Sequence, residues 1–186
     1  MKNIVAFGAS NSSQSINKQL ANFAAHQLAD VEVNLLDLND FEMPIFSIDR
    51  EKESGIPDLA TAFKKHIENS DGIIISFAEH NGAYSAAFKN IFDWISRIGK
   101  DVWANKPMFL MATSPGGRGG QTVLDIAVNK FKFMNPSTQV SFSLPSFHKN
   151  FSREEGIVDE ELRNAFETQL KQFEAAVVES KSTANA

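Results

Sequence analysis

The 186-residue chain contains no cysteine, which excludes a disulfide framework and a thiolate metal site. Basic residues are also scarce: 18 lysines and arginines stand against 23 acidic residues, and the net charge of −5 argues against a nucleic-acid-binding protein. No apolar run is long enough to cross a membrane, and the four histidines lack the spacing of metal ligands. The first three residues lead directly into a predicted strand, without room for a signal peptide. We therefore expect a cytoplasmic protein with no metal ion and no nucleic-acid or membrane partner.

The fingerprints of the common nucleotide-binding loops are missing as well. The turn after the first predicted strand has no Gly-x-Gly-x-x-Gly, as in dinucleotide sites, and no Gly-Lys-Ser/Thr, as in nucleoside triphosphate sites. No Ser-His-Asp arrangement and no pair of carboxylates stands out either, so the sequence predicts no catalytic side chain.

What the chain does contain is a strand, a serine-rich turn and a helix within residues 4–17. The apolar run ends at Gly8, and amphipathic helical spacing begins at Ile16. In one interpretation Ser15 simply caps the helix; in the other, the turn binds a phosphate. Hydroxyls and amides without a lysine suit a monoester such as that of FMN, which flavodoxin-like sheets bind at such a place. Four serines lie within six residues, where the first amides of the helix lack partners: Ser10, Ser12, Ser13 and Ser15.

Apolar strands alternate with amphipathic helices along the rest of the chain. This alternation is typical of a parallel sheet with helices on both faces, so we predict an α/β layer sandwich. No linker or internal repeat divides it, and we expect one domain at 1–180 followed by a polar tail at 181–186. Residues 37–57 and 145–157 read as irregular loops. The predicted strands after the first lie at 31–36, 72–78, 108–112 and 138–144, and the helices after the first at 57–69, 84–95, 124–131 and 162–177.

Two further strand-to-helix loops are polar or rich in glycine, and they emerge at the same sheet edge as the serine-rich turn. They are residues 79–83 and the four-glycine loop 114–120. Glycine lets backbone approach a ligand closely and frees amides to point at it. Each loop also has a simpler interpretation, in which the glycines only turn the chain and Glu79 and Asn81 are turn or capping residues. Taken together, the three loops favour a planar ring lying against two of them, with its phosphate on the first.

Three motifs resemble those of the NADPH-dependent FMN reductase family. Residues 9–17 are similar to its Gly-Ser-x-Arg-x-x-Ser-x-Asn motif. Residues 78–94 resemble its Pro-Glu-Tyr-Asn-x-Ser stretch with the continuation Leu-Lys-Asn-x-x-Asp-Trp, and residues 114–117 resemble its Ser-Pro-Gly loop. The motifs occur in order at suitable intervals, and the resemblance extends to about residue 178. It implies a flavodoxin-like three-layer α/β/α sandwich with a five-stranded parallel sheet in the order 2-1-3-4-5.

The resemblance also implies which residues bind FMN. Those that would hold the phosphate are Ser10, Ser12, Ser15, Ile16 and Asn17. Those that would line the edge of the ring, largely through backbone, are Ala78, Glu79, His80, Asn81 and Gly82. Those that would flank the same ring are Ser114, Pro115, Gly116, Gly117, Arg118 and Gly119.

By this resemblance the protein is an FMN-dependent oxidoreductase. It would pass a hydride from NAD(P)H to FMN and electrons on to a quinone, azo compound, free flavin or similar acceptor. Family members commonly form homodimers with the flavin near the subunit interface, and some form homotetramers.

The chain departs from the family pattern at several positions, among them Ala83, Ser85 and Ala86, which replace the family's serine and the following Pro-Gly. Ser12 stands where the family usually has arginine, Ala78 where it has proline, and His80 where it has tyrosine. Considered singly, His80 and Arg118 also have a simpler interpretation as surface residues without a functional role. The departures leave open a flavin-free binding or regulatory module on the same fold, and a flavodoxin-like one-electron carrier is a further alternative.

Overall fold

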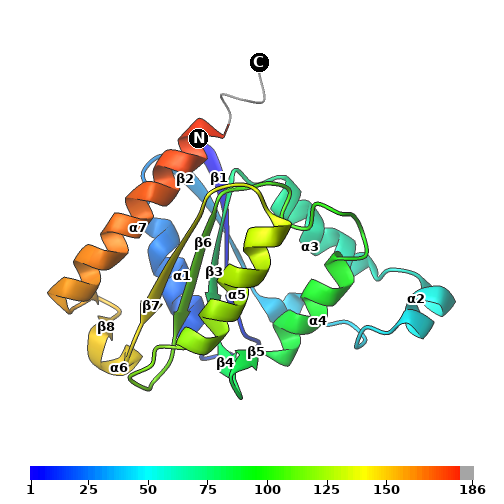
Figure 1. Cartoon of the computed structure of the whole chain (residues 1–186), viewed down its shortest axis with the longest axis horizontal. Coiled ribbons are helices and arrows are strands. Elements are labelled where there is room, and N and C mark those ends of the chain that lie inside the picture. The colour runs from blue at the N-terminus through cyan, green and yellow to red at the C-terminus, as the bar shows by residue number, and fades with distance from the viewer. Residues whose placement is uncertain (181–186) are drawn as a thin grey trace.

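Strand β1 (Lys2–Ala9) lies inside the sheet, because from Ile4 onward its residues are buried on both faces and none is polar. It pairs with β2 (Val31–Leu36) on one side and β3 (Gly72–Phe77) on the other. Strands β6 (Met108–Thr113) and β7 (Gln139–Leu144) continue the sheet beyond β3, and every pairing is parallel. The computed structural model describes residues 1–180, and its order β2-β1-β3-β6-β7 confirms the predicted order 2-1-3-4-5 (Figure 1). The predicted polar tail, 181–186, lies outside the described residues.

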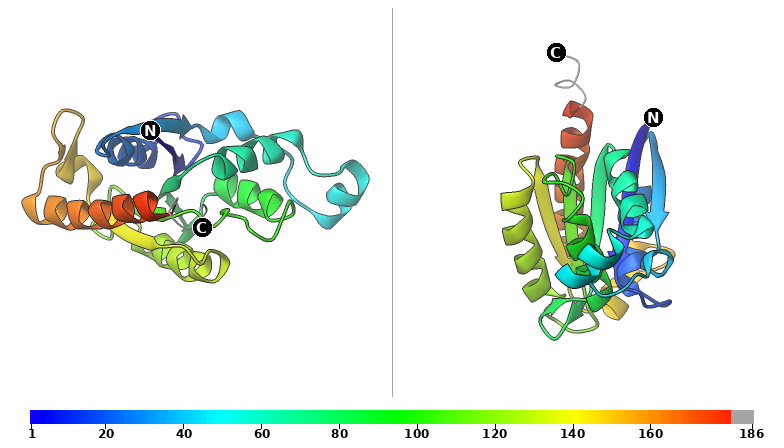
Figure 2. Two further views of the ribbon diagram at one scale, coloured as in Figure 1. Left: turned by 90° about the horizontal axis from the view of Figure 1, so that it is seen from above. Right: turned by 90° about the vertical axis from the view of Figure 1, so that its right-hand side faces the viewer.

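Helices cover both faces of this sheet and give the molecule three layers (Figure 2). Helices α1 (Ile16–His26) and α7 (Glu160–Glu179) pack on one face. Helices α3 (Asp58–Glu68), α4 (Ala86–Ile95) and α5 (Gln121–Met134) pack on the other. Within the described part of the chain, no helix combines the length and the apolar composition needed to cross a bilayer.

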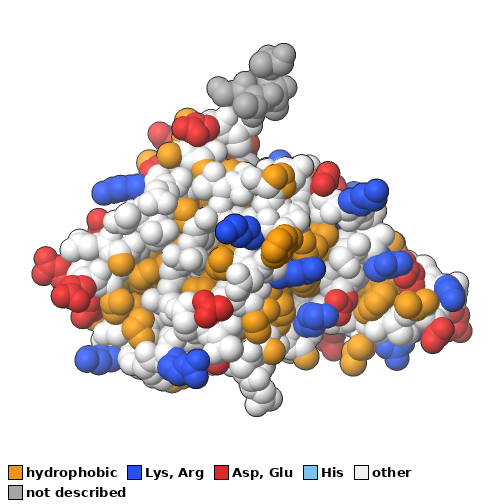
Figure 3. Space-filling view, in the orientation of Figure 1, with side chains coloured by type: hydrophobic (Ala, Val, Ile, Leu, Met, Phe, Trp, Pro, Cys, Tyr) orange, Lys and Arg blue, Asp and Glu red, His pale blue; other side chains and the backbone are white. Residues whose placement is uncertain are grey.

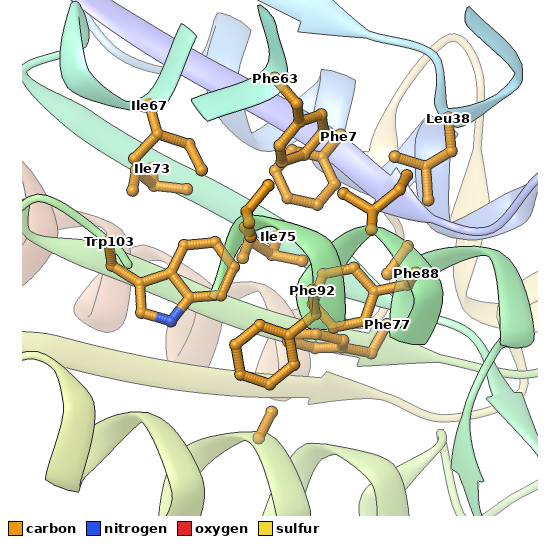
Figure 4. Close-up of a cluster of buried hydrophobic side chains, with 14 of the residues drawn as sticks. Phe7, Leu38, Phe63, Ile67, Ile73, Ile75, Phe77, Phe88, Phe92 and Trp103 are labelled. Carbon is orange, nitrogen blue, oxygen red and sulfur yellow. The ribbon is translucent and has the colours of Figure 1, made fainter. Parts of the chain in front are cut away.

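Aromatic side chains fill the layer between the sheet and helices α3, α4 and α5 (Figure 4). Phe7 of β1 meets Phe63 of α3 edge to face, with ring centroids 5.4 Å apart. Phe92 of α4 stacks on Trp103 at 5.6 Å. Each fully buried large apolar side chain contributes about 1.5–3 kcal/mol relative to an exposed one, so this layer fixes the helices on the sheet. The loops at the carboxyl ends of the strands are thereby held in place.

Residues 37–57 are not the irregular loop that the sequence predicts. They contain a 3-10 helix, η1 (Leu38–Phe41), and a short helix, α2 (Ile48–Ser54), capped by Ser47. Helix α2 buries none of its residues, so no apolar face marks it in the sequence.

One face of α4 holds residues 43–51, which we call the strap. The side chain of Asn90 accepts from the backbone N of Phe46 at 2.8 Å and donates to the carbonyl O of Met43 at 3.0 Å. The Nε1 of Trp94 donates to the carbonyl O of Pro44 at 2.7 Å. The Nε of Arg97 lies 3.0 and 3.1 Å from the two carboxylate oxygens of Glu51. The strap therefore rests on Asn90 and Trp94, four residues apart on α4, and on Arg97 in the turn that follows the helix.

Residues 145–157 also contain small elements in place of a predicted loop. A four-residue helix, α6 (Phe147–Asn150), leads into the hairpin of β8 (Phe151–Ser152) and β9 (Gly156–Ile157). A Cβ on Gly156 would lie 2.2 Å from the ring of Phe23, so glycine allows this hairpin to pack against α1.

Candidate functional site

The serine-rich turn follows β1 and lies against the first turn of α1. A Cβ on Gly8 would lie 2.4 Å from the backbone N of Lys18 and 2.7 Å from its Cα, so glycine allows the strand end to touch the helix. The turn also forms bonds with itself. The backbone N of Ser12 donates to Ser10 Oγ at 3.2 Å, and the backbone N of Gln14 donates to Ser12 Oγ at 3.3 Å.

Ser15 is the N-cap of α1, which confirms the capping interpretation for this serine. Its Oγ accepts a hydrogen bond from the backbone N of Lys18 at 3.1 Å. Its carbonyl O accepts one from the backbone N of Gln19 at 3.2 Å. The amides of Ile16 and Asn17 have no intrahelical acceptor. These two amides and the positive end of the helix dipole favour an anion here, and its identity as a phosphate stays a prediction.

The side chain of Asn17 is buried beneath the turn and makes three hydrogen bonds. Its Oδ1 accepts from Ser76 Oγ at 2.7 Å and from the backbone N of Thr113 at 3.1 Å. Its Nδ2 donates to the carbonyl O of Thr113 at 3.2 Å. The side chain therefore ties α1 to the ends of β3 and β6, and the group of Asn17 left to meet an anion is its backbone amide.

A short hairpin stands at the end of β3, formed by β4 (Glu79–His80) and β5 (Ala83–Tyr84). The turn residues Asn81 and Gly82 have φ values of 52° and 74°, the left-handed conformation of a type I′ turn. The turn interpretation of Asn81 is thus confirmed. The hairpin projects beyond the edge of the sheet in Figure 1, and its tip stands clear of the rest of the surface in Figure 3.

Glu79 caps a helix of another part of the chain. Its Oε2 accepts from the backbone N of Val123, in the first turn of α5, at 3.1 Å. Gly120, the N-cap residue of α5, offers no side-chain bond, so the carboxylate of Glu79 takes that role and fixes the hairpin to α5.

Replacing Glu79 by alanine should lower the free energy of unfolding by about 1 kcal/mol, because the first turn of α5 loses its acceptor. Urea unfolding followed by circular dichroism measures the change. A glutamine at this position keeps an acceptor oxygen and should lose less. Equal stability of the parent and the alanine variant would contradict the capping role.

The glycines of loop 114–120 fall into two pairs. Gly119 and Gly120 have left-handed backbone, with φ values of 59° and 73°, and a Cβ on Gly119 would lie 2.9 Å from the backbone N of Pro145. The turning interpretation therefore explains this pair. Gly116 and Gly117 are exposed and meet no such constraint. Arg118, also exposed, donates from Nη2 to Thr122 Oγ1 at 2.9 Å.

A cavity of about 290 Å³ opens between the serine-rich turn, the base of the hairpin and the end of β6. Ten predicted residues line it: Ser10, Ser12, Ser15, Ile16, Asn17, Ala78, Glu79, His80, Ser114 and Pro115. Six lie at the hairpin tip or farther along the loop and do not line it: Asn81, Gly82, Gly116, Gly117, Arg118 and Gly119. The assignment of all sixteen to FMN stays a prediction.

Two residues that line the cavity were not predicted. Gln14 lies within the serine-rich turn. The position of this turn between strand and helix was a signal from which Gln14 could have been predicted as a site residue. Thr113 is the last residue of β6, and its Oγ1 donates to the carbonyl O of Leu144 at 2.7 Å. A second cavity of about 190 Å³ borders the turn at Asn11 and lies between the strap and α4.

An ion pair between Lys18 and Asp37 joins α1 to the segment after β2. Hydrogen bonds from Lys18 Nζ and from the backbone N of Asn39 lower the pKa of Asp37 below its ordinary value. A lowered pKa in the folded state stabilises the protein above the pKa of the unfolded chain, about 3.9. That stabilisation is lost as the pH falls through the folded-state pKa.

Asp37→Asn should therefore be less stable than the parent at neutral pH, and the difference should disappear in acid below the ordinary aspartate pKa. We expect a difference below about 1 kcal/mol, since both side chains are 32% exposed. Urea midpoints of both proteins across this pH range check the expectation, with Asp93→Asn, which breaks the exposed pair with Lys89, as the control. A difference that grows in acid would contradict it.

Comparison with known proteins places this arrangement in context. The family model described as NADPH-dependent FMN reductase matches residues 2–149. A 2-hydroxy-1,4-benzoquinone reductase of a Burkholderia species is 36% identical over 107 residues, and the chain spans 56% of that relative's length and matches over 56% of its own. An NADPH:quinone oxidoreductase of Arabidopsis thaliana is 27% identical over 148 residues, which cover 78% of this chain and 74% of that protein.

Among solved structures, the flavoenzyme NAD(P)H:(acceptor) oxidoreductase FerB from Paracoccus denitrificans is similar with a TM-score of 0.76. The two chains are 22% identical, and the match covers 96% of this chain and 98% of the other. This likeness confirms the predicted flavodoxin-like fold.

Proposed function

The chain belongs to the NADPH-dependent FMN reductase family, and from that membership we propose that it is an FMN-dependent oxidoreductase that accepts a hydride from NAD(P)H. Electrons then pass to a quinone, azo compound, free flavin or similar acceptor. The observation that carries the proposal is the serine-rich turn, whose free donors face the cavity at the start of α1.

The donors around the turn fit the phosphate of FMN by their chemistry. The amides of Ile16 and Asn17 lack intrahelical acceptors. The hydroxyl oxygens of Ser10, Ser12 and Ser15 each accept one backbone amide, which leaves the hydroxyl hydrogen of each to donate. These neutral donors favour an anion of low charge, and no lysine or arginine lines the cavity within the described residues.

Two fixed loops would hold the flavin ring beside this phosphate site. The hairpin is anchored to α5 through Glu79, so its backbone at His80 is held at the cavity wall. The exposed backbone of Gly116 and Gly117 leaves room for close approach of a planar group. Bound FMN would supply the redox chemistry, and the chain would supply position and electrostatics.

The printed activities of the relatives support the acceptor class. The Burkholderia and Arabidopsis proteins are quinone reductases by name, so we propose a quinone as one acceptor of this protein. The proposal includes a homodimer or homotetramer, as the family resemblance implies, and the cytoplasmic location expected from the sequence.

The visible absorption spectrum of purified protein loaded with FMN tests the function. Addition of NADH or NADPH without oxygen should bleach the yellow colour within seconds. Colour that persists with both nucleotides would argue against the reductase. Colourless protein that takes up no FMN would favour a flavin-free binding module, and stepwise reduction through a stable one-electron state would favour a one-electron carrier.

A further inference from the structure

The hairpin turn beside the cavity contains the only Asn-Gly pair in the sequence. Asn81 is exposed, and its side chain makes no hydrogen bond to any described residue. The space around Gly82 is open, since a Cβ there would have its nearest neighbour at 3.9 Å, the Cγ2 of Thr122. The turn stands clear of the surface in Figure 3.

We propose that Asn81 is a site of spontaneous deamidation. The backbone N of Gly82 attacks Cγ of Asn81, the new N–Cγ bond forms, and the Cγ–Nδ2 bond breaks with release of ammonia. Water then opens the resulting five-membered imide at either carbonyl and leaves aspartate or isoaspartate. The reaction consumes only water, and glycine favours it because no side chain shields the attacking nitrogen.

The hairpin is small enough to permit the reaction in the folded protein. The left-handed backbone of the turn must relax before the nitrogen of Gly82 reaches Cγ of Asn81. Glu79 anchors the base of the hairpin to α5, but only two residue pairs join its strands, Glu79 with Tyr84 and His80 with Ala83. A two-stranded hairpin is marginally stable by itself, so the turn at its tip can open while the base stays anchored. Brief local opening therefore gives the reaction its geometry.

Other asparagines of the site lack this combination. The side chain of Asn17 is buried with three hydrogen bonds, and that of Asn90 is bonded to the strap. Asn11 is exposed in the neighbouring turn but precedes Ser12, whose side chain hinders the attacking amide, and that amide already donates to Ser10 Oγ. Asn11 therefore serves as an internal reference within the same protein.

The product would alter the wall of the cavity. In isoaspartate the main chain runs through the former side-chain carbon, so it is longer by one carbon atom. The turn has only two residues between the paired strands. A type I′ turn does not accommodate the extra atom, so the pairing that positions Glu79 and His80 would shift. A carboxylate would also appear near the anion site. This consequence rests on the proposed function: FMN should bind several-fold more weakly to aged protein.

The modification itself is tested by mass. Full-length protein is incubated at mildly alkaline pH and physiological temperature, then digested and mapped by mass spectrometry. The peptide with Asn81 should gain the mass difference between an amide and a carboxylic acid, and it should elute as two chromatographic peaks, for aspartate and isoaspartate. The peptide with Asn11 should change more slowly. An unchanged Asn81 in folded protein, beside complete reaction of the same residue in urea-unfolded protein, would overturn the proposal.

Flavin titration separates the consequence from the modification. Fresh and aged parent are compared with fresh and aged Asn81→Gly, which suits the turn and cannot deamidate. FMN affinity should fall several-fold on ageing in the parent and stay unchanged on ageing in the variant. Equal affinity of fresh and modified parent would reject the effect on FMN. If fresh parent binds no FMN, the proposed function fails, while the mass result still decides the modification.

Discussion

Replacing Asn17 by leucine should destabilise the protein by about 3 kcal/mol or more. Leucine has a similar size but offers no polar atom, so the buried backbone N and O of Thr113 and the hydroxyl of Ser76 lose their partner. Each buried group left without a hydrogen bond costs about 1–3 kcal/mol. The loss is therefore larger than that of an ordinary surface bond.

The matched control is Asn22→Leu on the same helix, where the side chain makes no hydrogen bond to a described residue. Urea unfolding should show a large loss for position 17 and a small change for position 22. Asn17→Asp keeps the acceptor but points a second oxygen at the carbonyl of Thr113, so it should also be destabilising. Similar stability at positions 17 and 22 would show that the three bonds do not support the fold.

Gly8→Ala should have an effect of comparable size. The new Cβ would lie 2.4 Å from the backbone N of Lys18, so the first turn of α1 must move away from the strand. Overpacking of this kind costs about 1–3 kcal/mol and more where the contact is with backbone. The displacement would also pull the amides of Ile16 and Asn17 from the cavity, and FMN affinity should fall with stability.

Gly117→Ala is the control, because a Cβ at that position meets no atom within 4 Å. Thermal unfolding should leave this variant close to the parent and lower the melting temperature of Gly8→Ala by several degrees. If both alanines have the same effect, close approach of β1 and α1 is not what position 8 requires.

The sheet and its helices were predictable because their signals are local. Continuous apolar residues in β3 and β6 mark central parallel strands, and apolar spacing of three and four marks α4 and α7. Helix α2 and the small hairpins gave no such signal. Helix α2 has no buried residue, and the strands β4, β5, β8 and β9 are two residues long.

The position of the candidate site was predictable from the sequence, but the structural roles of individual side chains were not. A polar turn between strand and helix indicates the carboxyl edge of the sheet, and ten predicted residues do line a cavity there. The roles of Asn17 and Glu79 depend on partners that lie 96 and 44 residues away. Sequence pattern carries no information on such distant bonds, so the structural roles of these two side chains could not be predicted, and the assignment of both residues to FMN stays a prediction.

The strap is a segment that can vary without changing the sheet. Its anchors lie on α4 and in the turn just after it, and it pairs with no strand, so its length and sequence can change without altering the register of the sheet. It also forms one wall of the cavity beside Asn11, on the far side of the serine-rich turn. Differences between related proteins should therefore concentrate in this segment, while the strand ends beside the serine-rich turn stay constant.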